Sequence, residues 1–280
     1  MHDALIAEPP VRTNPTFLNA SMLGGSIAER VWAARDAGFD RLGLRPGDVE
    51  DCKGDGDALR GLVQEASLGV SDYQIIADFD GACDARRSRT RAEATAMLDS
   101  AVAVGAELVV VSASTNPDCI PSRIDNDMRW LAREAAHRQL RVAYEPTACS
   151  TFNSTLRSAW QCVRRVHEPN LGLALDVFHV FARGGDESDL DGVRTDRIFL
   201  VQLSDLAHGV PFQDICETAN HHRLLPGQGR FPIRSILERL REVNYQGPIG
   251  LEVLNDELRA RDPAAVAREA MAALSRVWVT

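Results

Sequence analysis

The sequence lacks any hydrophobic run that could span a membrane. Hydrophobic residues make up 45% of its 280 residues, but no run reaches the ~20 consecutive apolar residues that a membrane-spanning helix needs. The start of the chain, MHDALI, also lacks the basic region and the long apolar stretch of a secretory signal peptide. We therefore expect a cytoplasmic protein with no membrane partner.

Positive charge and cysteine are also scarce. The 31 basic residues are outnumbered by 40 acidic ones, and the net charge of −9 disfavours a nucleic-acid partner. No two cysteines form a C-x-x-C pair, so neither a zinc ribbon nor a thioredoxin-type site is expected. We predict reduced, buried thiols, as is usual in the cytoplasm. The thiols concerned are Cys52, Cys83, Cys119, Cys149, Cys162 and Cys216.

Short apolar runs alternate with helical patterns along the chain. Continuous apolar runs of this length are typical of strands buried on both faces of a parallel sheet. Strands are predicted at 16–19, 39–44, 70–77, 108–111, 141–144, 171–175, 198–201 and 249–251. Helices are predicted at 27–37, 58–68, 88–104, 152–166, 233–243 and 263–277.

Eight β/α units of about 35 residues predict an α/β fold, a (β/α)8 TIM barrel with a single domain over residues 1–280. A doubly wound sheet is the alternative, but no G-x-G-x-x-G follows the first strand. Residues 1–14 are expected to form an N-terminal extension. Residues 205–229 are too many for an ordinary βα loop, and we expect them to form a lid or wall at the barrel mouth.

Oxygen-bearing side chains follow four successive predicted strands at intervals of 31, 26 and 50 residues: Glu145, Asp176, Gln202 and Glu252. In a barrel these strand ends converge on one mouth, where three carboxylates would repel one another without a cation between them. Oxygen ligands suit Mg²⁺, Mn²⁺ or Co²⁺, with Zn²⁺ as a further option. The sequence therefore predicts one divalent metal site. The alternative is that each residue is a separate helix cap or ion pair.

Further polar residues are expected around this mouth. His179 follows Asp176 by three residues and would lie on the loop that leaves the mouth. There it could act as a general base or hydrogen-bond the substrate, without itself binding the metal. His221, His222 and Arg223 precede a Pro-Gly-Gln-Gly turn in the long loop, and an arginine there could hold a carboxylate or phosphate. A purely structural role is the alternative for each.

At these residues the sequence resembles the xylose isomerase-like TIM-barrel superfamily of sugar isomerases and epimerases. The resemblance implies that one divalent ion is bound by Glu145, Asp176, Gln202 and Glu252. The second half is most similar to the 3-dehydroshikimate dehydratase branch. That similarity rests on Phe178-His179, Gln202, the run 221–229 and the run 255–259.

The first half departs from that branch. The chain has RLGLRP at 41–46 in place of an acidic end to the second strand, and QIIAD at 74–78 where the branch carries an arginine. Pro-Thr-Ala-Cys at 146–149 replaces a more apolar stretch. These positions face the ligand in the family, so the resemblance makes Gln74 a candidate substrate-binding residue and leaves the substrate open.

The predicted site suits enediolate chemistry. A divalent ion on a carbonyl oxygen acidifies the neighbouring C–H bond, and His179, Glu145 or Glu252 could then remove the α-proton. Reprotonation would epimerise or isomerise the substrate, whereas loss of a β-hydroxyl would dehydrate it. We predict a metal-dependent isomerase or epimerase acting on a small polyhydroxylated ketone, with a 3-dehydroshikimate dehydratase-like lyase as the alternative.

Two other classes of protein are alternatives to a metal-dependent isomerase or lyase. A homo-oligomer is compatible with all of these classes. A non-catalytic binding or regulatory subunit is disfavoured because the metal ligands are intact. An apurinic-site endonuclease of the same fold would need a basic face and more histidines at the strand ends. The chain offers neither.

Overall fold

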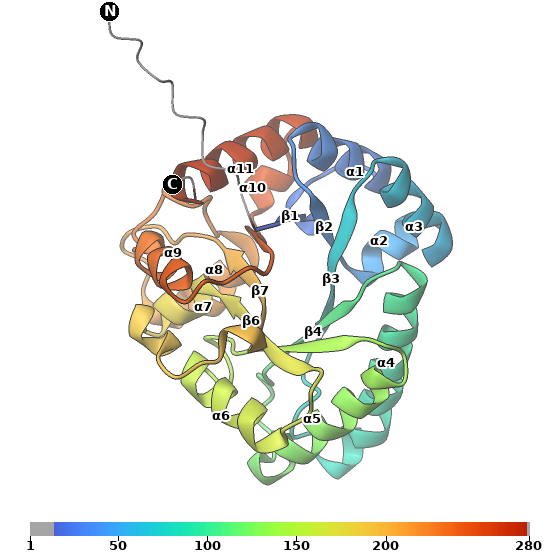
Figure 1. Ribbon diagram of the computed structural model, residues 1–280, viewed down its shortest axis with the longest axis vertical. Coiled ribbons are helices and arrows are strands. Elements are labelled where there is room, and N and C mark those ends of the chain that lie inside the picture. Colours follow the sequence, from blue (N-terminus) through green and yellow to red (C-terminus); the bar gives the residue numbers. More distant parts are fainter. Residues whose placement is uncertain (1–13, 279–280) are drawn as a thin grey trace, which may run out of the picture.

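The computed structural model describes residues 14–278, within which eight parallel strands close into a barrel (Figure 1). The strands hydrogen-bond in chain order, and the eighth returns to the first. They are β1 (Thr16–Asn19), β2 (Arg41–Leu44), β3 (Gly69–Ile76), β4 (Leu108–Ser112), β5 (Arg141–Glu145), β6 (Leu171–Asp176), β7 (Ile198–Leu203) and β8 (Ile249–Leu251). The predicted TIM barrel is confirmed.

Helices form the outer ring, and α11 closes it by packing beside α1 (Figure 1). The longer ones are α1 (Ile27–Asp36), α3 (Gly56–Glu65), α4 (Asp84–Ala103), α5 (Pro121–Ala136), α6 (Leu156–Val166), α9 (Ile233–Glu242) and α11 (Pro263–Trp278). Shorter helices lie in the connections between strands and the longer helices: α2 (Pro46–Asp51), α7 (Val177–Ala182), α8 (Ile215–His221) and α10 (Asp256–Arg259). Among residues 14–278, no helix combines the length and apolar character needed to cross a membrane.

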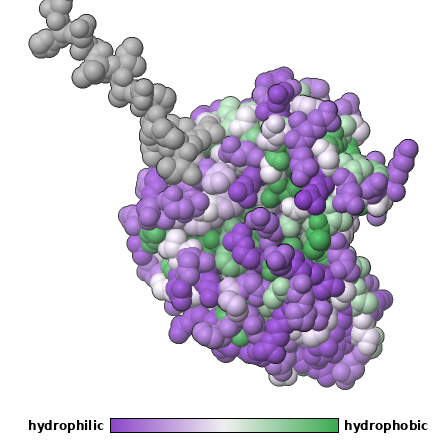
Figure 2. All heavy atoms as spheres, turned by 45° about the vertical axis from the view of Figure 1, so that its right-hand side comes forward, coloured by the Kyte–Doolittle hydropathy of each residue, from purple (hydrophilic) through white to green (hydrophobic). Residues whose placement is uncertain are grey.

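The apolar strands are explained by two hydrophobic layers. One fills the barrel interior, where Phe17, Val110 and Phe199 belong to a single cluster. The other lies between the strands and the helical ring. Every residue of β4 and β6 is buried, because one face of each strand serves the interior and the other serves the helices. The face shown in Figure 2 is mainly hydrophilic, as expected outside such a ring.

The structure differs from two predicted boundaries or leaves them partly undescribed. The helix expected from residue 152 begins instead at Leu156, because Thr155 caps it and forms a reciprocal capping box with Ser158. Phe152 lies outside the helix with 49% of its surface exposed. Of the extension expected at 1–14, residues 1–13 lie outside the described residues. Asn14 is buried and donates hydrogen bonds to the carbonyls of Tyr245 and Gly247.

Candidate active site

Four polar side chains stand at the carboxyl ends of neighbouring strands. β5 ends at Glu145 and β6 at Asp176, Gln202 precedes the last residue of β7, and Glu252 directly follows β8. In the parallel ladder Asp176 pairs with Gln202, which pairs with Gly250. None of the four side-chain positions is more than 4% exposed. The fold thus gathers them, away from water, at one end of the barrel.

Negative charge is concentrated at this point. One donor atom from each of Glu145, Asp176 and His179 lies within 4.8 Å of the others. Burial raises the pKa of Glu145 well above its ordinary value, and the charges of Glu252 and Asp176 raise it further. Burial also raises the pKa of Asp176, although Arg223 opposes that shift. The cluster therefore favours a neutralising cation.

Arg223 supplies part of that positive charge. Its Nη1 donates to Asp176 Oδ2 at 2.7 Å and lies 3.5 Å from Glu252 Oε2. The guanidinium also rests 4.7 Å from the centre of the Phe178 ring, and its Nε donates to the carbonyl of Ala219. Arg223 is thus a buried, fully supported member of the carboxylate cluster rather than a flexible surface residue.

The other oxygen of Glu252 has its own set of donors. Glu252 Oε1 accepts hydrogen bonds from Gln74 Nε2 at 2.5 Å, Arg45 Nη2 at 2.7 Å and Asn19 Nδ2 at 3.4 Å. Asn19 ends β1, and Arg45 directly follows β2. Neither was selected from the sequence as a site residue. Their positions at strand ends were the available signal, since the same rule identified the four candidate ligands.

Gln202 retains a free acceptor. Its Nε2 donates to Gln74 Oε1 at 3.2 Å, but its Oε1 is buried and has no hydrogen-bond partner within residues 14–278. A buried amide oxygen without a partner is unfavourable, and a hard cation would satisfy it. The crowded carboxylates and this unpaired amide oxygen together form a set of ligands that suits a divalent metal ion.

The candidate substrate residue Gln74 lies between two of the candidate metal ligands. It is only 1% exposed, and both ends of its side-chain amide are occupied, one by Glu252 and the other by Gln202. Gln74 therefore bridges two candidate metal ligands. Its hydrogen bonds restrain the side chains of Glu252 and Gln202.

His179 lies in the short helix α7, not on the loop that was predicted. The helix begins directly after Asp176, whose Oδ1 accepts a hydrogen bond from the backbone N–H of Phe178. His179 Nδ1 accepts the backbone N–H of Ala148 at 3.2 Å, and its Nε2 lies 3.6 Å from Asp176 Oδ2. Burial, helped by Arg223, lowers the pKa of His179 to about 3. The ring is therefore neutral, and its proton resides on Nε2.

Only one member of the predicted His221, His222 and Arg223 group reaches the carboxylates. His221 Nδ1 lies 3.0 Å from Asp256 Oδ2, and His222 is exposed. Residues 221–223 connect α8 to a backbone bridge between Asp205 and Leu224. Successive side chains in this stretch point to opposite sides, so the exposed His222 is followed by the buried Arg223.

Asp205 organises the Pro-Gly-Gln-Gly turn that follows. Its Oδ1 accepts the backbone N–H groups of Leu206 and Phe231, and its Oδ2 accepts those of Gly227 and Gly229. A Cβ at Gly229 would lie 2.2 Å from the Leu206 carbonyl oxygen, which explains the glycine. One buried carboxylate thereby fixes both ends of the segment that carries Arg223.

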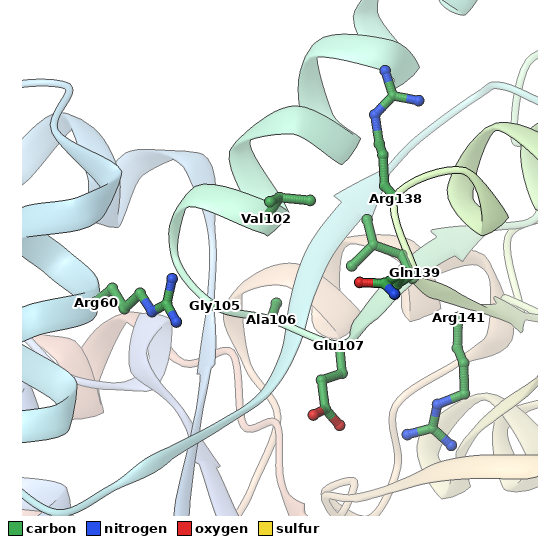
Figure 3. A pocket seen from close by; sticks show the side chains of 9 residues that line it. Arg60, Val102, Gly105, Ala106, Glu107, Arg138, Gln139 and Arg141 are labelled. Atoms are coloured by element: carbon green, nitrogen blue, oxygen red, sulfur yellow. The ribbon is translucent and has the colours of Figure 1, made fainter.

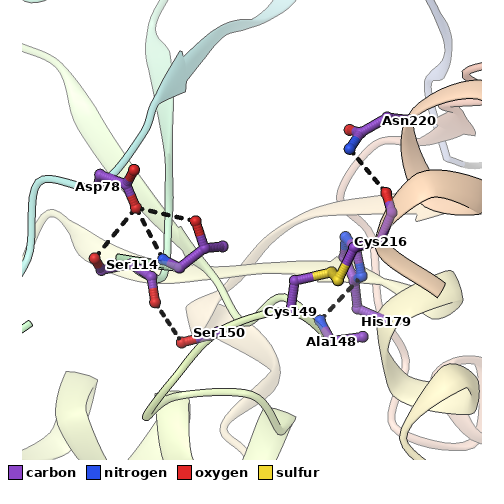
Figure 4. The surroundings of a disulfide bond; sticks show 9 residues. Asp78, Ser114, Ala148, Cys149, Ser150, His179, Cys216 and Asn220 are labelled. Carbon is purple, nitrogen blue, oxygen red and sulfur yellow. Dashed lines mark hydrogen bonds between the residues drawn. A yellow bond between two sulfur atoms is a disulfide. The ribbon is translucent and has the colours of Figure 1, made fainter. Parts of the chain in front are cut away.

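The prediction of reduced, buried cysteines holds for Cys119 and Cys162; Cys52 and Cys83 are free but only half-buried, and the remaining two are not free thiols. Cys149, half-buried after β5, forms a disulfide with Cys216, an exposed residue of α8. Figure 4 shows this bond beside the hydrogen bond from Ala148 to His179. The pairing was not visible in the sequence because 67 residues separate the two cysteines. They meet because α8 folds over the β5–α6 connection.

A separate cavity of about 380 Å³ lies at the opposite end of the barrel. Its lining includes residues 105–107, which lead into β4, and residues 138–140, which lead into β5. In Figure 3 the guanidinium groups of Arg138 and Arg141 point in opposite directions, and Arg138 is paired with Asp99 and Glu134. The polar groups do not converge there, so the mouth is the candidate active site.

Residues 31–277 match the family model described as the xylose isomerase-like TIM barrel. The chain belongs to that family. Curated proteins similar to this chain are enzymes named as dehydratases and isomerases.

Two curated relatives illustrate this range. A 3-dehydroshikimate dehydratase from Pseudomonas aeruginosa is 33% identical over 254 residues, which cover 90% of this chain and 40% of that protein. An inosose isomerase from Halalkalibacterium halodurans is 30% identical over 104 residues, covering 37% of this chain and 36% of that protein. The chain thus spans about 40% or less of the length of these relatives in the aligned regions.

Two solved structures share the fold. A fusion protein of a xylose isomerase-like TIM barrel and a 4-hydroxyphenylpyruvate dioxygenase superposes with a TM-score of 0.88 at 28% identity, covering 93% of this chain and 42% of that one. The IolI protein, solved with a bound zinc atom, gives a TM-score of 0.84 at 19% identity, covering 94% and 98%. At that identity the second likeness concerns the fold.

Proposed function

We propose that the protein is a divalent-metal-dependent lyase that dehydrates a cyclic β-hydroxy ketone of the 3-dehydroshikimate class. The observation that carries the proposal is the buried cluster of Glu145, Asp176 and Glu252 with the orphaned oxygen of Gln202. The extent of the dehydratase match supports the substrate class, since it covers 90% of the chain, against 37% for the inosose isomerase.

The ion would be held by the four strand-end residues: Glu145, Asp176, Gln202 and Glu252. When bound, it would supply Lewis acidity that polarises the substrate ketone and stabilises the enolate. The protein's own contribution is to exclude water from these side chains and to fix them on rigid strand ends. Gln74 and Arg223 restrain the ligands by their hydrogen bonds to Glu252 and Asp176.

Glu145 is the best candidate for the base. Its buried carboxylate stands at the end of β5 beside Asp176 and His179, within the cluster at the mouth where the substrate would lie. Glu252 is less suited because Arg45 and Gln74 both donate to its Oε1. In this assignment the α C–H bond breaks, its proton passes to Glu145, and the electron pair forms the enolate.

His179 is assigned to the leaving hydroxyl. Because Nδ1 accepts the N–H of Ala148, the neutral ring presents Nε2–H as a donor. That donor hydrogen-bonds the β-hydroxyl, and the proton taken up by Glu145 passes to the same hydroxyl, directly or through solvent, as the C–O bond breaks. The substrate therefore loses one water molecule without oxidation or reduction, and Glu145 is again a carboxylate. For 3-dehydroshikimate, loss of water and tautomerisation give aromatic 3,4-dihydroxybenzoate.

An isomerase or epimerase remains the second candidate, because the same base and cluster would serve reprotonation of an enediolate. The partial match to an inosose isomerase favours that alternative. Metal-loaded protein should be incubated separately with 3-dehydroshikimate and with an inosose, and the products identified by NMR. Formation of 3,4-dihydroxybenzoate supports the lyase. Conversion of the inosose without any aromatic product from dehydroshikimate would reject the lyase in favour of the isomerase.

A further inference from the structure

Arg45 places a second positive charge at the mouth, on the other side of Glu252 from Arg223. Its Nη2 is bonded to Glu252 Oε1, whereas Arg223 approaches Oε2. Arg45 is held in place through its backbone N–H, which donates to Asp48 Oδ2 at 2.7 Å. Unlike the nearly inaccessible Arg223, its side chain is 28% exposed, so it is open to a ligand entering the mouth.

The hydrogen bonding of Arg45 is incomplete. Its Nε is buried but has no hydrogen-bond partner within residues 14–278. A guanidinium offers five N–H donors in a planar fork that matches a carboxylate. The bond to Glu252 occupies Nη2, and because Nε is buried, an entering ligand would meet the exposed remainder of the side chain. The geometry is that of an arginine with capacity for a second anionic partner.

The charge balance of the mouth changes when a metal binds. Without metal, the carboxylates of Glu145, Asp176 and Glu252 outnumber the guanidinium groups of Arg45 and Arg223, and His179 is neutral. A divalent ion would offset the negative charge of these carboxylates. Metal binding therefore makes the mouth less repulsive to a negatively charged substrate.

We propose that Arg45 is a specificity-determining residue that binds the carboxylate of the substrate and so selects a polyhydroxylated keto acid over a neutral ketose or inosose. The proposal rests on the proposed function, because it concerns the same mouth. The alternative is that Arg45 serves only as the counter-ion of Glu252 and does not contact the substrate. The two roles differ in whether Arg45 distinguishes ligands that differ by one carboxylate.

A matched pair of probes separates these roles. 3,4-Dihydroxybenzoate and catechol share the same two hydroxyl groups, and only the first carries a carboxylate. Their dissociation constants should be measured by calorimetry on metal-loaded protein at equal metal occupancy. A charge-assisted hydrogen bond predicts that the wild type prefers the carboxylate ligand by roughly tenfold or more. Arg45→Gln should reduce that preference to about threefold or less, and Arg45→Lys should retain an intermediate preference.

Arg41→Gln is the control, because Arg41 begins the same strand at the opposite end of the barrel. It removes the same charge and should leave the preference unchanged. The proposal is wrong if Arg45→Gln keeps the wild-type preference for the carboxylate ligand. It is also wrong if the wild type shows no such preference or binds neither probe. Carboxylate selectivity without any dehydration of 3-dehydroshikimate would instead overturn the proposed reaction and leave the role of Arg45 standing.

Discussion

Arg223 Nη1 lies 2.7 Å from Asp176 Oδ2, which joins the long β7–β8 connection to the end of β6. The same guanidinium approaches Glu252 after β8, so one side chain links two candidate metal ligands. Because both carboxylates are buried, their charges depend on this arginine and on a metal ion for neutralisation. The connection is therefore part of the site's electrostatics.

Replacing one ligand should reduce metal binding. Glu252→Gln keeps the size of the side chain but removes a negative charge from the predicted ligand set. We expect less bound metal per chain, measured by inductively coupled plasma mass spectrometry, and a proportionate or larger loss of turnover. Glu238→Gln, an exposed change on α9, is the control. Unchanged metal content and rate in Glu252→Gln would remove Glu252 from the ligand set.

His179 is expected to affect turnover without supporting the fold or the metal. His179→Gln should keep the thermal midpoint within a few degrees and the metal content near that of the wild type. Loss of an acid–base group typically costs ~10²–10⁴-fold, and we expect a fall in kcat of at least the lower figure.

The location of the defect distinguishes the roles of His179. If His179 serves the leaving hydroxyl, the variant should still exchange the substrate α-proton with D₂O while releasing little product. Loss of exchange in parallel with product formation would instead make His179 the base. An unaltered kcat would exclude both roles.

Asp205 should control the position of Arg223. Asp205→Asn replaces one acceptor oxygen by an amide that faces the N–H groups of either Leu206 and Phe231 or Gly227 and Gly229. Unsatisfied buried donors cost about 1–3 kcal/mol each, so we expect a lower free energy of unfolding by roughly 2–4 kcal/mol and a raised KM. Denaturant unfolding and steady-state kinetics test this. Asp214→Asn, an exposed change in the same segment, should do neither, and a silent Asp205→Asn would show that the turn forms without its carboxylate.

The disulfide between Cys149 and Cys216 should stabilise the folded chain. It closes a segment of 67 residues, for which the chain-entropy estimate is about 4 kcal/mol. We expect the double variant Cys149→Ser/Cys216→Ser to unfold at lower denaturant concentration than the oxidised wild type. A reducing agent should lower the stability of the wild type but not of the double variant. Cys52→Ser, which removes a free thiol, is the control, and equal stability with and without reductant would show that the bond contributes little.

The barrel and its four strand-end oxygens were predictable because both depend on local, repeated patterns. Apolar runs identify buried strands, and a polar residue that ends such a run must lie at the mouth. Glu145 and Asp176 follow this rule directly. The rule also applies to Asn19 and Arg45, but each of these was overlooked because it stands alone in a less regular part of the chain.

Contacts between distant segments were not predictable in the same way. The pairing of Cys149 with Cys216 and the bonds from Gln74 to Glu252 and Gln202 depend on how connections fold across the mouth. The helix α5 was missed for another reason, since Ile124, Met128, Leu131 and Ala135 do keep helical spacing. Its apolar residues are separated by many charged ones, which weakens the visible pattern.

Removal of an α-proton at this mouth, with the help of a divalent ion, is the step on which the proposed function depends. Proton NMR in D₂O tests it most directly, with 3-dehydroshikimate added to protein that has been chelator-treated and then reloaded with Mg²⁺, Mn²⁺, Co²⁺ or Zn²⁺ in turn. We expect loss of the proton α to the ketone, together with aromatic product, in at least one reloaded sample and neither in the chelated one. Retention of the α-proton in every reloaded sample, or equal loss with and without metal, would contradict it.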